Sequence, residues 1–384
     1  MARVRGRVPR ALAAALLAVG LVGCATFPDN GPREWQEQIE GAGELGGIPR
    51  VPESVEPTAP PTGEPAPQGG TPPEPEPCDD PDPAVIATCL DPVGAIAVLP
   101  DGVTALVAER RTGRVLRVAR DVEPQLVATV DVDASGGGGL TGLVLSSSYA
   151  EDRLLYAYAT TPEDNRVVRI AEGEPPEAVL TGIPRGPVNN GGALGVDVDG
   201  SLLVATGDAG GADPASLAGK LLRVDAFGRP ATGNPDAASP VLSSGLVAPG
   251  GVCVNAATTA AWVTDRRGGQ DVLHLVVPGA LGPAAWSWPE RPGVAGCVAQ
   301  QDVVAVAQSG AGALFVLRTD PLTTAFTATE IQLPGVYGRL SAASLGPDGL
   351  IWLGTVNKDG GVPVPSDDRV LVLPPVASGG QSRA

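Results

Sequence analysis

Six similar units follow one another from about residue 89 to about residue 375, and this recurrence limits the possible folds more than any other feature. Each unit contains a small-residue-rich apolar stretch, a polar turn that is often Asp-Gly, a second apolar stretch, a glycine-rich loop and a third β-branched stretch. Short β-branched runs with turn residues between them are typical of strands. The units cover residues 93–118, 140–170, 186–225, 249–276, 295–319 and 338–373.

Repeats at intervals of about 45–60 residues, each with several strands, indicate a β-propeller. We therefore expect an all-β fold in which residues 89–375 form six blades, with small first strands around a crowded central channel. The fourth strand of each blade would come from the less regular stretches between units. A pair of β-sandwich domains is the alternative, but it would not explain six recurrences of one pattern.

The residues before the repeats predict export and a membrane anchor. Four arginines precede a short apolar core that ends in "LVGC", a lipobox, so residues 1–23 are expected to be a signal peptide cleaved before a lipidated Cys24. Of the 36 residues from 48 to 83, 13 are proline, a composition that cannot bury a core. We expect residues 24–88 to be a disordered tether and residues 376–384 a flexible tail. Together these features predict a monomeric lipoprotein on the outer face of a bacterial cell membrane.

The charge balance narrows the range of partners. The chain holds 43 acidic and 26 basic residues, and its formal net charge is −17. Such a surface repels nucleic acid and anionic lipid headgroups, so neither is an expected partner, and the membrane contact would be made by the lipid anchor.

Four further cysteines remain: Cys78, Cys89, Cys253 and Cys297. An even number in an exported chain indicates disulfides, and three pairings are possible. Cys78 and Cys89 are close in the sequence, and a bridge between them would join the tether to the propeller. Cys253 and Cys297 each lie in the first strand of a unit, in units four and five, so a bridge between them would join adjacent blades.

Several motifs occur in the order found in one known family. They are "GGGGLTGLVL" (136–145), "NNGGALGVDVDGSLLVATGDAG" (189–210), "SLAGKLLRVD" (216–225), "AWVTDRRGGQDVLHLVVPG" (261–279), "GRLSAASLGPDG" (338–349) and "DDRVLVL" (367–373). Over roughly residues 90–373 the chain resembles the soluble quinoprotein sugar dehydrogenases, the glucose/sorbosone dehydrogenase family, and within it the LppZ-type lipoproteins of mycobacteria. The resemblance implies a six-bladed propeller, with pyrroloquinoline quinone (PQQ) and calcium as cofactors.

The resemblance also shows where this chain departs from the family. Asn189 takes the place of the histidine that acts as general base, and an amide cannot accept a proton near neutral pH. PQQ carries three carboxylates, so its pocket needs several fixed positive charges. The polar or basic positions of the family that are changed here are Gly137, Val247, Ala248, Gly310 and Ser341.

The residues that remain as candidates are few. Asn190, Arg266 and Arg339 could contact a cofactor, and Asp208 is the fallback base. Asp271 lies where the family has a calcium-binding acidic pair, although its neighbour is Val272. The one histidine, His274, is interpreted as a strand residue with a local hydrogen bond. Asp367, Asp368 and Arg369 are expected to close the last blade.

These substitutions favour a propeller that has lost sugar oxidation and serves as a binding or scaffold module, with a sugar or a cell-envelope ligand in its channel. The alternative is an active PQQ-dependent aldose dehydrogenase with a rearranged site, in which Arg266, Arg267 and Arg339 hold carboxylates. A metal-dependent lactonase or hydrolase, with Asn189, Asn190, Asp208 and Asp271 as ligands, is a third interpretation.

Overall fold

The computed structural model describes residues 78–211, 213–320 and 323–376. The predicted signal peptide, Cys24 and most of the predicted tether and tail lie outside these residues. Within them, the only helical segments are the single turns α1 (Tyr149–Asp152) and η1 (Ser135–Gly137), and every other regular element is a strand. No helix in these ranges is long and apolar enough to cross a membrane.

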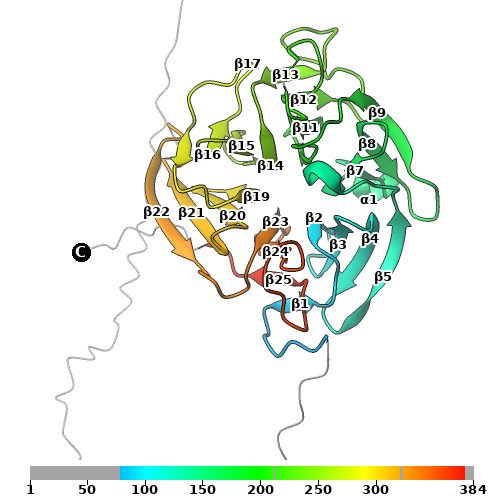
Figure 1. Ribbon diagram of the computed structural model, residues 1–384, viewed down its shortest axis with the longest axis vertical. Helices are drawn as coiled ribbons and strands as arrows, with labels where there is room; N and C mark the ends of the chain where they lie inside the picture. Colours follow the sequence, from blue (N-terminus) through cyan, green and yellow to red (C-terminus); the bar gives the residue numbers. More distant parts are fainter. Residues whose placement is uncertain (1–77, 212, 321–322, 377–384) are drawn as a thin grey trace, which may run out of the picture. The chain divides into compact units, whose positions relative to one another are not determined.

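Six sheets surround a common axis, as the repeats predicted (Figure 1). Blade one contains β2 (Val93–Val98), β3 (Thr104–Glu109), β4 (Arg114–Ala119) and β5 (Val122–Thr129), and blade two contains β6 (Leu140–Leu145), β7 (Leu155–Thr160), β8 (Asn165–Ile170) and β9 (Glu177–Ile183). Blade three contains β10 (Gly192–Val196), β11 (Leu202–Thr206), β12 (Lys220–Val224), β13 (Val241–Ser244) and the parallel strand β17 (Gly279–Ala280). Blade four contains β14 (Ala248–Val254), β15 (Ala261–Arg266), β16 (Asp271–Leu275) and β18 (Trp286–Trp288), and blade five contains β19 (Val294–Gln300), β20 (Val303–Gln308), β21 (Ala313–Thr319) and β22 (Phe326–Gln332).

Blade six closes the ring with strands from both ends of the described chain. Its inner strands are β23 (Leu340–Leu345), β24 (Ile351–Thr355) and β25 (Val370–Leu373), and its outer strand is β1 (Val85–Ala87) (Figure 1). The fourth strand of this blade therefore does not come from a stretch between units, and the propeller includes residues before position 89. Antiparallel pairing of β1 with β25 satisfies backbone groups of the last blade and joins it to the start of the chain.

The small residues of the innermost strands allow the blades to meet near the axis. A Cβ atom on Gly94 of β2 would lie 2.1 Å from the carbonyl oxygen of Leu140 in β6, the first strand of the next blade. A Cβ atom on Gly251 of β14 would lie 2.8 Å from the backbone nitrogen of Cys297 in β19. Only glycine fits at such approaches, which explains the small first strand of each unit.

Both predicted disulfides are present. Cys78 is bonded to Cys89, and Cys253 is bonded to Cys297. The second bridge joins β14 and β19, the innermost strands of blades four and five, so it ties two neighbouring blades beside the channel.

Candidate functional site

One end of the central channel opens into a cavity of about 480 Å³, which we call the funnel. All six blades contribute to its wall, among them Val93, Thr141, Gly192, Pro249, Ala295 and Ser341. Below the funnel, a bore of about 340 Å³ continues along the axis, and Gly94, Thr141 and Gly250 line both spaces. A ligand in the funnel would therefore be in reach of loops from every blade.

Three arginines from different blades face the funnel. Arg110 follows β3, Arg266 ends β15, and Arg339 precedes β23. Within the described parts of the chain, the guanidinium groups of Arg266 and Arg339 make no hydrogen bond or ion pair, and Nε of Arg339 is buried without a partner. Unpaired guanidinium groups of this kind are suited to bind carboxylate or phosphate oxygens.

The charges of the funnel favour an anion. Its one acidic lining residue is Asp359, whose carboxylate pairs with Arg110. Desolvation by the surrounding protein lowers the pKa of Arg266. The carboxylate of Asp271 opposes this shift, whereas the positive charges of Arg110 and Arg339 add to it. Three cations against one carboxylate leave the funnel positive, in a chain whose net charge is −17. An incoming anion would relieve the repulsion among the arginines.

Arg110 was missed in the sequence, although a repeated pattern marks it. "ERR" at 109–111 ends the second strand of unit one, and "DRR" at 265–267 ends the second strand of unit four. In both blades the acid is fully buried and the first arginine faces the funnel. Glu109 accepts the backbone N–H of Asp91 (2.9 Å), and Asp265 accepts that of Ala248 (2.7 Å), so each acid anchors the segment that leads into its blade. The same local structure thus delivers an arginine from blades one and four.

Asn189 borders a second cavity of about 510 Å³ beside the funnel, and Arg266 lines both. Nδ2 of Asn189 donates to Oδ1 of Asp208 (2.9 Å), and the same Oδ1 accepts from the backbone N–H of Gly210 (2.9 Å). Asp208 is not among the residues that line either cavity. Arg267 lines this second cavity and is paired with Asp265 at 2.9 Å.

Two further candidates from the sequence do not reach the cavities. Asn190 is completely buried, and its amide accepts from the N–H and donates to the C=O of Gly186, both at 2.7 Å. Asp271 is 2% exposed, and its Oδ2 accepts from the backbone N–H of Gly293 (2.7 Å) and Val294 (3.1 Å). Both side chains hold loops in place, so neither joins Arg266 and Arg339. The described ranges contain no group of three or more His, Cys, Asp or Glu that could hold a metal ion.

His274 lies on β16, as its interpretation as a strand residue predicted; it is buried and lines neither cavity. Nη2 of Arg267 lies 3.1 Å from its Nε2 and can only donate, so Nε2 carries no proton. Burial, together with the positive charge of Arg267, lowers the pKa of His274 to about 4. The histidine is therefore neutral and structural.

The propeller and its funnel have relatives among known proteins. The family model described as glucose/sorbosone dehydrogenase matches residues 90–292. The PQQ-bound aldose sugar dehydrogenase of Streptomyces coelicolor is 32% identical with a TM-score of 0.69, and the match covers 75% of this chain and 95% of that one. A putative oxidoreductase (glucose dehydrogenase) of Thermus thermophilus is 31% identical with a TM-score of 0.69, over 75% of this chain and 98% of that one.

The soluble aldose sugar dehydrogenase of Escherichia coli, solved in its apo form, is 20% identical with a TM-score of 0.64 over 76% of this chain and 98% of that one, and it supports the fold alone. A comparison with curated proteins found no match. The similar structures confirm the propeller fold that the repeats predicted.

Proposed function

Because the chain belongs to the glucose/sorbosone dehydrogenase family, we propose that its funnel binds a carboxylate-rich anion and that the protein is a binding module without sugar oxidation. The observation that carries this proposal is the convergence of Arg110, Arg266 and Arg339 on one cavity, where Arg266 and Arg339 have no partner among the described residues. No histidine lines that cavity, and its one carboxylate, on Asp359, is paired with Arg110.

The funnel fits the carboxylates of PQQ better than it fits sugar oxidation. Arg266 and Arg339 could each bind one carboxylate of PQQ. Arg110 could bind the third carboxylate while it stays paired with Asp359. When bound to the family's sugar dehydrogenases, PQQ supplies the hydride acceptor. Oxidation of a sugar also requires a group that takes the hydroxyl proton, and the amide of Asn189 cannot do so. The carboxylate of Asp208 accepts from Asn189 and Gly210, and Asp208 lines neither cavity, so the described residues would hold a cofactor-like anion without a base facing it.

The second candidate function is an active aldose dehydrogenase, which is favoured by the PQQ-bound relative at 32% identity. The lactonase interpretation has less support, because Asn190 and Asp271 are bound to loops and do not converge with Asn189 and Asp208.

Calorimetric titration and a dye-reduction assay separate these functions. PQQ and citrate, an unrelated tricarboxylate, are titrated with and without calcium, and turnover is measured with aldoses. We expect binding without turnover. Arg266→Ala and Arg339→Ala should each weaken binding by about 10- to 150-fold, since a hydrogen bond to a charged group contributes about 1.5–3 kcal/mol. Arg229→Ala is the matched control, because its side chain is 70% exposed and lines neither cavity.

Dye reduction that depends on PQQ would replace this proposal with the dehydrogenase. Absence of binding by both anions would exclude an anion-binding funnel.

We further propose that Cys24 carries the lipid anchor, on the basis of the lipobox. Cys24→Ala should therefore move the protein from the membrane fraction to the medium or soluble fraction.

A further inference from the structure

We propose that the disulfide Cys78–Cys89 is a redox-sensitive lock that holds Arg339 and Asp359 in the funnel. The inference rests on the proposed function for the ligand, although the lock itself can be tested without one. Reduction would loosen the N-terminal loop and weaken anion binding at a site to which this loop contributes no lining residue.

The two bridges differ in accessibility. Cys78 and Cys89 are both exposed, whereas Cys253 and Cys297 are each 5% exposed. Thiol–disulfide exchange requires a thiolate to reach a sulfur atom, so a reductant reaches the first bridge far more easily. The bridge closes a loop that contains Asp80, Asp82 and β1.

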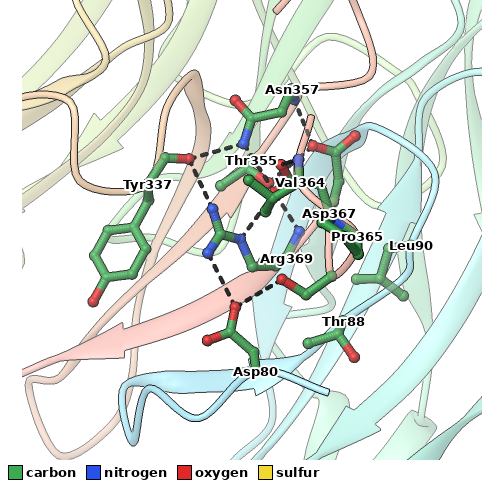
Figure 2. Close-up of polar contacts among 12 residues, drawn as sticks. Asp80, Thr88, Leu90, Tyr337, Thr355, Asn357, Val364, Pro365, Asp367 and Arg369 are labelled. Carbon is green, nitrogen blue, oxygen red and sulfur yellow. Dashed lines mark hydrogen bonds and ion pairs between the residues drawn. The ribbon is translucent and has the colours of Figure 1, made fainter. Parts of the chain in front are cut away.

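The side chains of Asp80 and Asp82 extend from the loop into the closing blade, and Figure 2 shows that of Asp80. Oδ2 of Asp80 accepts from Nη1 of Arg369 (3.0 Å) and from Oγ of Ser366 (2.9 Å). Despite burial, hydrogen bonds from its neighbours lower the pKa of Asp80, so its charge persists beside Arg369. Oδ2 of Asp82 accepts from the hydroxyl of Tyr337 (2.7 Å).

These contacts continue to a buried asparagine. Nε of Arg369 donates to Oδ1 of Asp367 (2.9 Å), which also accepts from Nδ2 of Asn357 (2.9 Å) (Figure 2). The same Nδ2 donates to the carbonyl of Tyr337 (2.8 Å). The contacts that start at Asp80 and at Asp82 therefore both lead to Asn357. This side chain is 3% exposed, so water cannot replace its protein partners.

Asn357 connects this network to the funnel. Its Oδ1 accepts the backbone N–H of Arg339 (2.7 Å), and the turn that begins at Asn357 carries Asp359, the partner of Arg110. The chain of contacts from Asp80 therefore ends at two residues that line the anion site. Its two ion pairs, Asp80–Arg369 and Arg369–Asp367, are largely shielded from water, so loss of one partner leaves an uncompensated charge that the other groups must rearrange to accommodate.

The chemical step is an exchange with an external dithiol. The attacking thiolate forms a mixed disulfide with one cysteine and releases the other as a thiolate, and the second sulfur of the dithiol then completes the exchange. The Cys78–Cys89 bond takes up two electrons and two protons to give two thiols, and the dithiol is oxidised to a disulfide.

Amide hydrogen exchange tests the lock directly. The protein is compared before and after treatment with dithiothreitol, and the variants C78A/C89A and Asp80→Asn are compared with the wild type. We expect the amides of Arg339 and of residues 357–361 to exchange at least about fivefold faster in all three altered states, and PQQ to bind at least about fivefold more weakly. Asp80→Asn keeps the disulfide and removes only the charge, so it separates the network from bridge loss.

The matched control is C253A/C297A, which removes the buried bridge and lowers global stability but takes part in none of the contacts between Asp80 and Arg339, so local exchange at Arg339 should be unchanged. Unchanged exchange at Arg339 in C78A/C89A would overturn the lock, and so would equal acceleration in the control, which would indicate general loosening. If neither PQQ nor citrate binds the wild type, the proposed function fails, while the exchange data still decide the lock.

Discussion

Removal of the Cys253–Cys297 bridge should destabilise the propeller by an amount that follows from its position in the chain. The bridge joins residues 44 apart in the sequence, with their Cα atoms 5.6 Å apart in adjacent innermost strands. In the chain-entropy model, a closed loop of this length restricts the unfolded chain by about 4 kcal/mol. The double variant C253A/C297A releases that restriction and leaves the folded ring otherwise intact.

For a domain of about 300 residues, a loss of 4 kcal/mol corresponds to a fall of roughly 6 °C in melting temperature. Differential scanning calorimetry of the oxidised proteins measures it. The matched comparison is C78A/C89A, whose loop spans 11 residues and which should lose only about 3 kcal/mol through chain entropy. A melting temperature of C253A/C297A within about 1 °C of the wild type would refute the reasoning.

Three further changes test other parts of the structure. Because the pKa of His274 is lowered from 6.5 to about 4, the unfolded chain binds this proton before the folded chain does as the pH falls, so the free energy of unfolding should decline from pH 6.5 to pH 4. In urea titrations, His274→Gln should reduce this dependence of the free energy of unfolding on pH, and an unchanged dependence would contradict the assignment. Gly251→Ala should cost about 1–3 kcal/mol because the new methyl meets the backbone of Cys297, whereas Gly282→Ala, in open space, should change stability by less than about 0.5 kcal/mol; equal losses in urea titrations would argue against close blade packing. Arg369→Met leaves the buried carboxylates of Asp80 and Asp367 without their counter-charge and should cost about 3–5 kcal/mol in the same assay, and a loss below about 1 kcal/mol would show that the network of Figure 2 does not stabilise the blade.

The repeats alone determined much of the fold, because each unit is a local pattern of strand and turn residues that is visible without knowledge of distant contacts. The innermost strands of the six blades follow from that pattern, and both disulfide pairings were predicted from where the cysteines lie relative to it. The outer strand of blade six was not predicted, because β1 pairs with β25 almost 300 residues later, and only ring closure brings the two together.

The site depended more on tertiary structure. The sequence identified Asn189, Arg266 and Arg339, which do border the cavities, but it also proposed Asn190 and Asp271, whose side chains bind backbone amides of nearby loops. Sequence alone cannot show whether a polar side chain points into a channel or stabilises its own loop, since both uses suit the same residue type. Arg110 joined the site only when the ring placed the end of β3 at the funnel wall, beside arginines that are far away in the chain. Local sequence patterns thus determine the family resemblance and the blades, whereas the positive charge of the funnel results from closure of the ring, which brings distant arginines together.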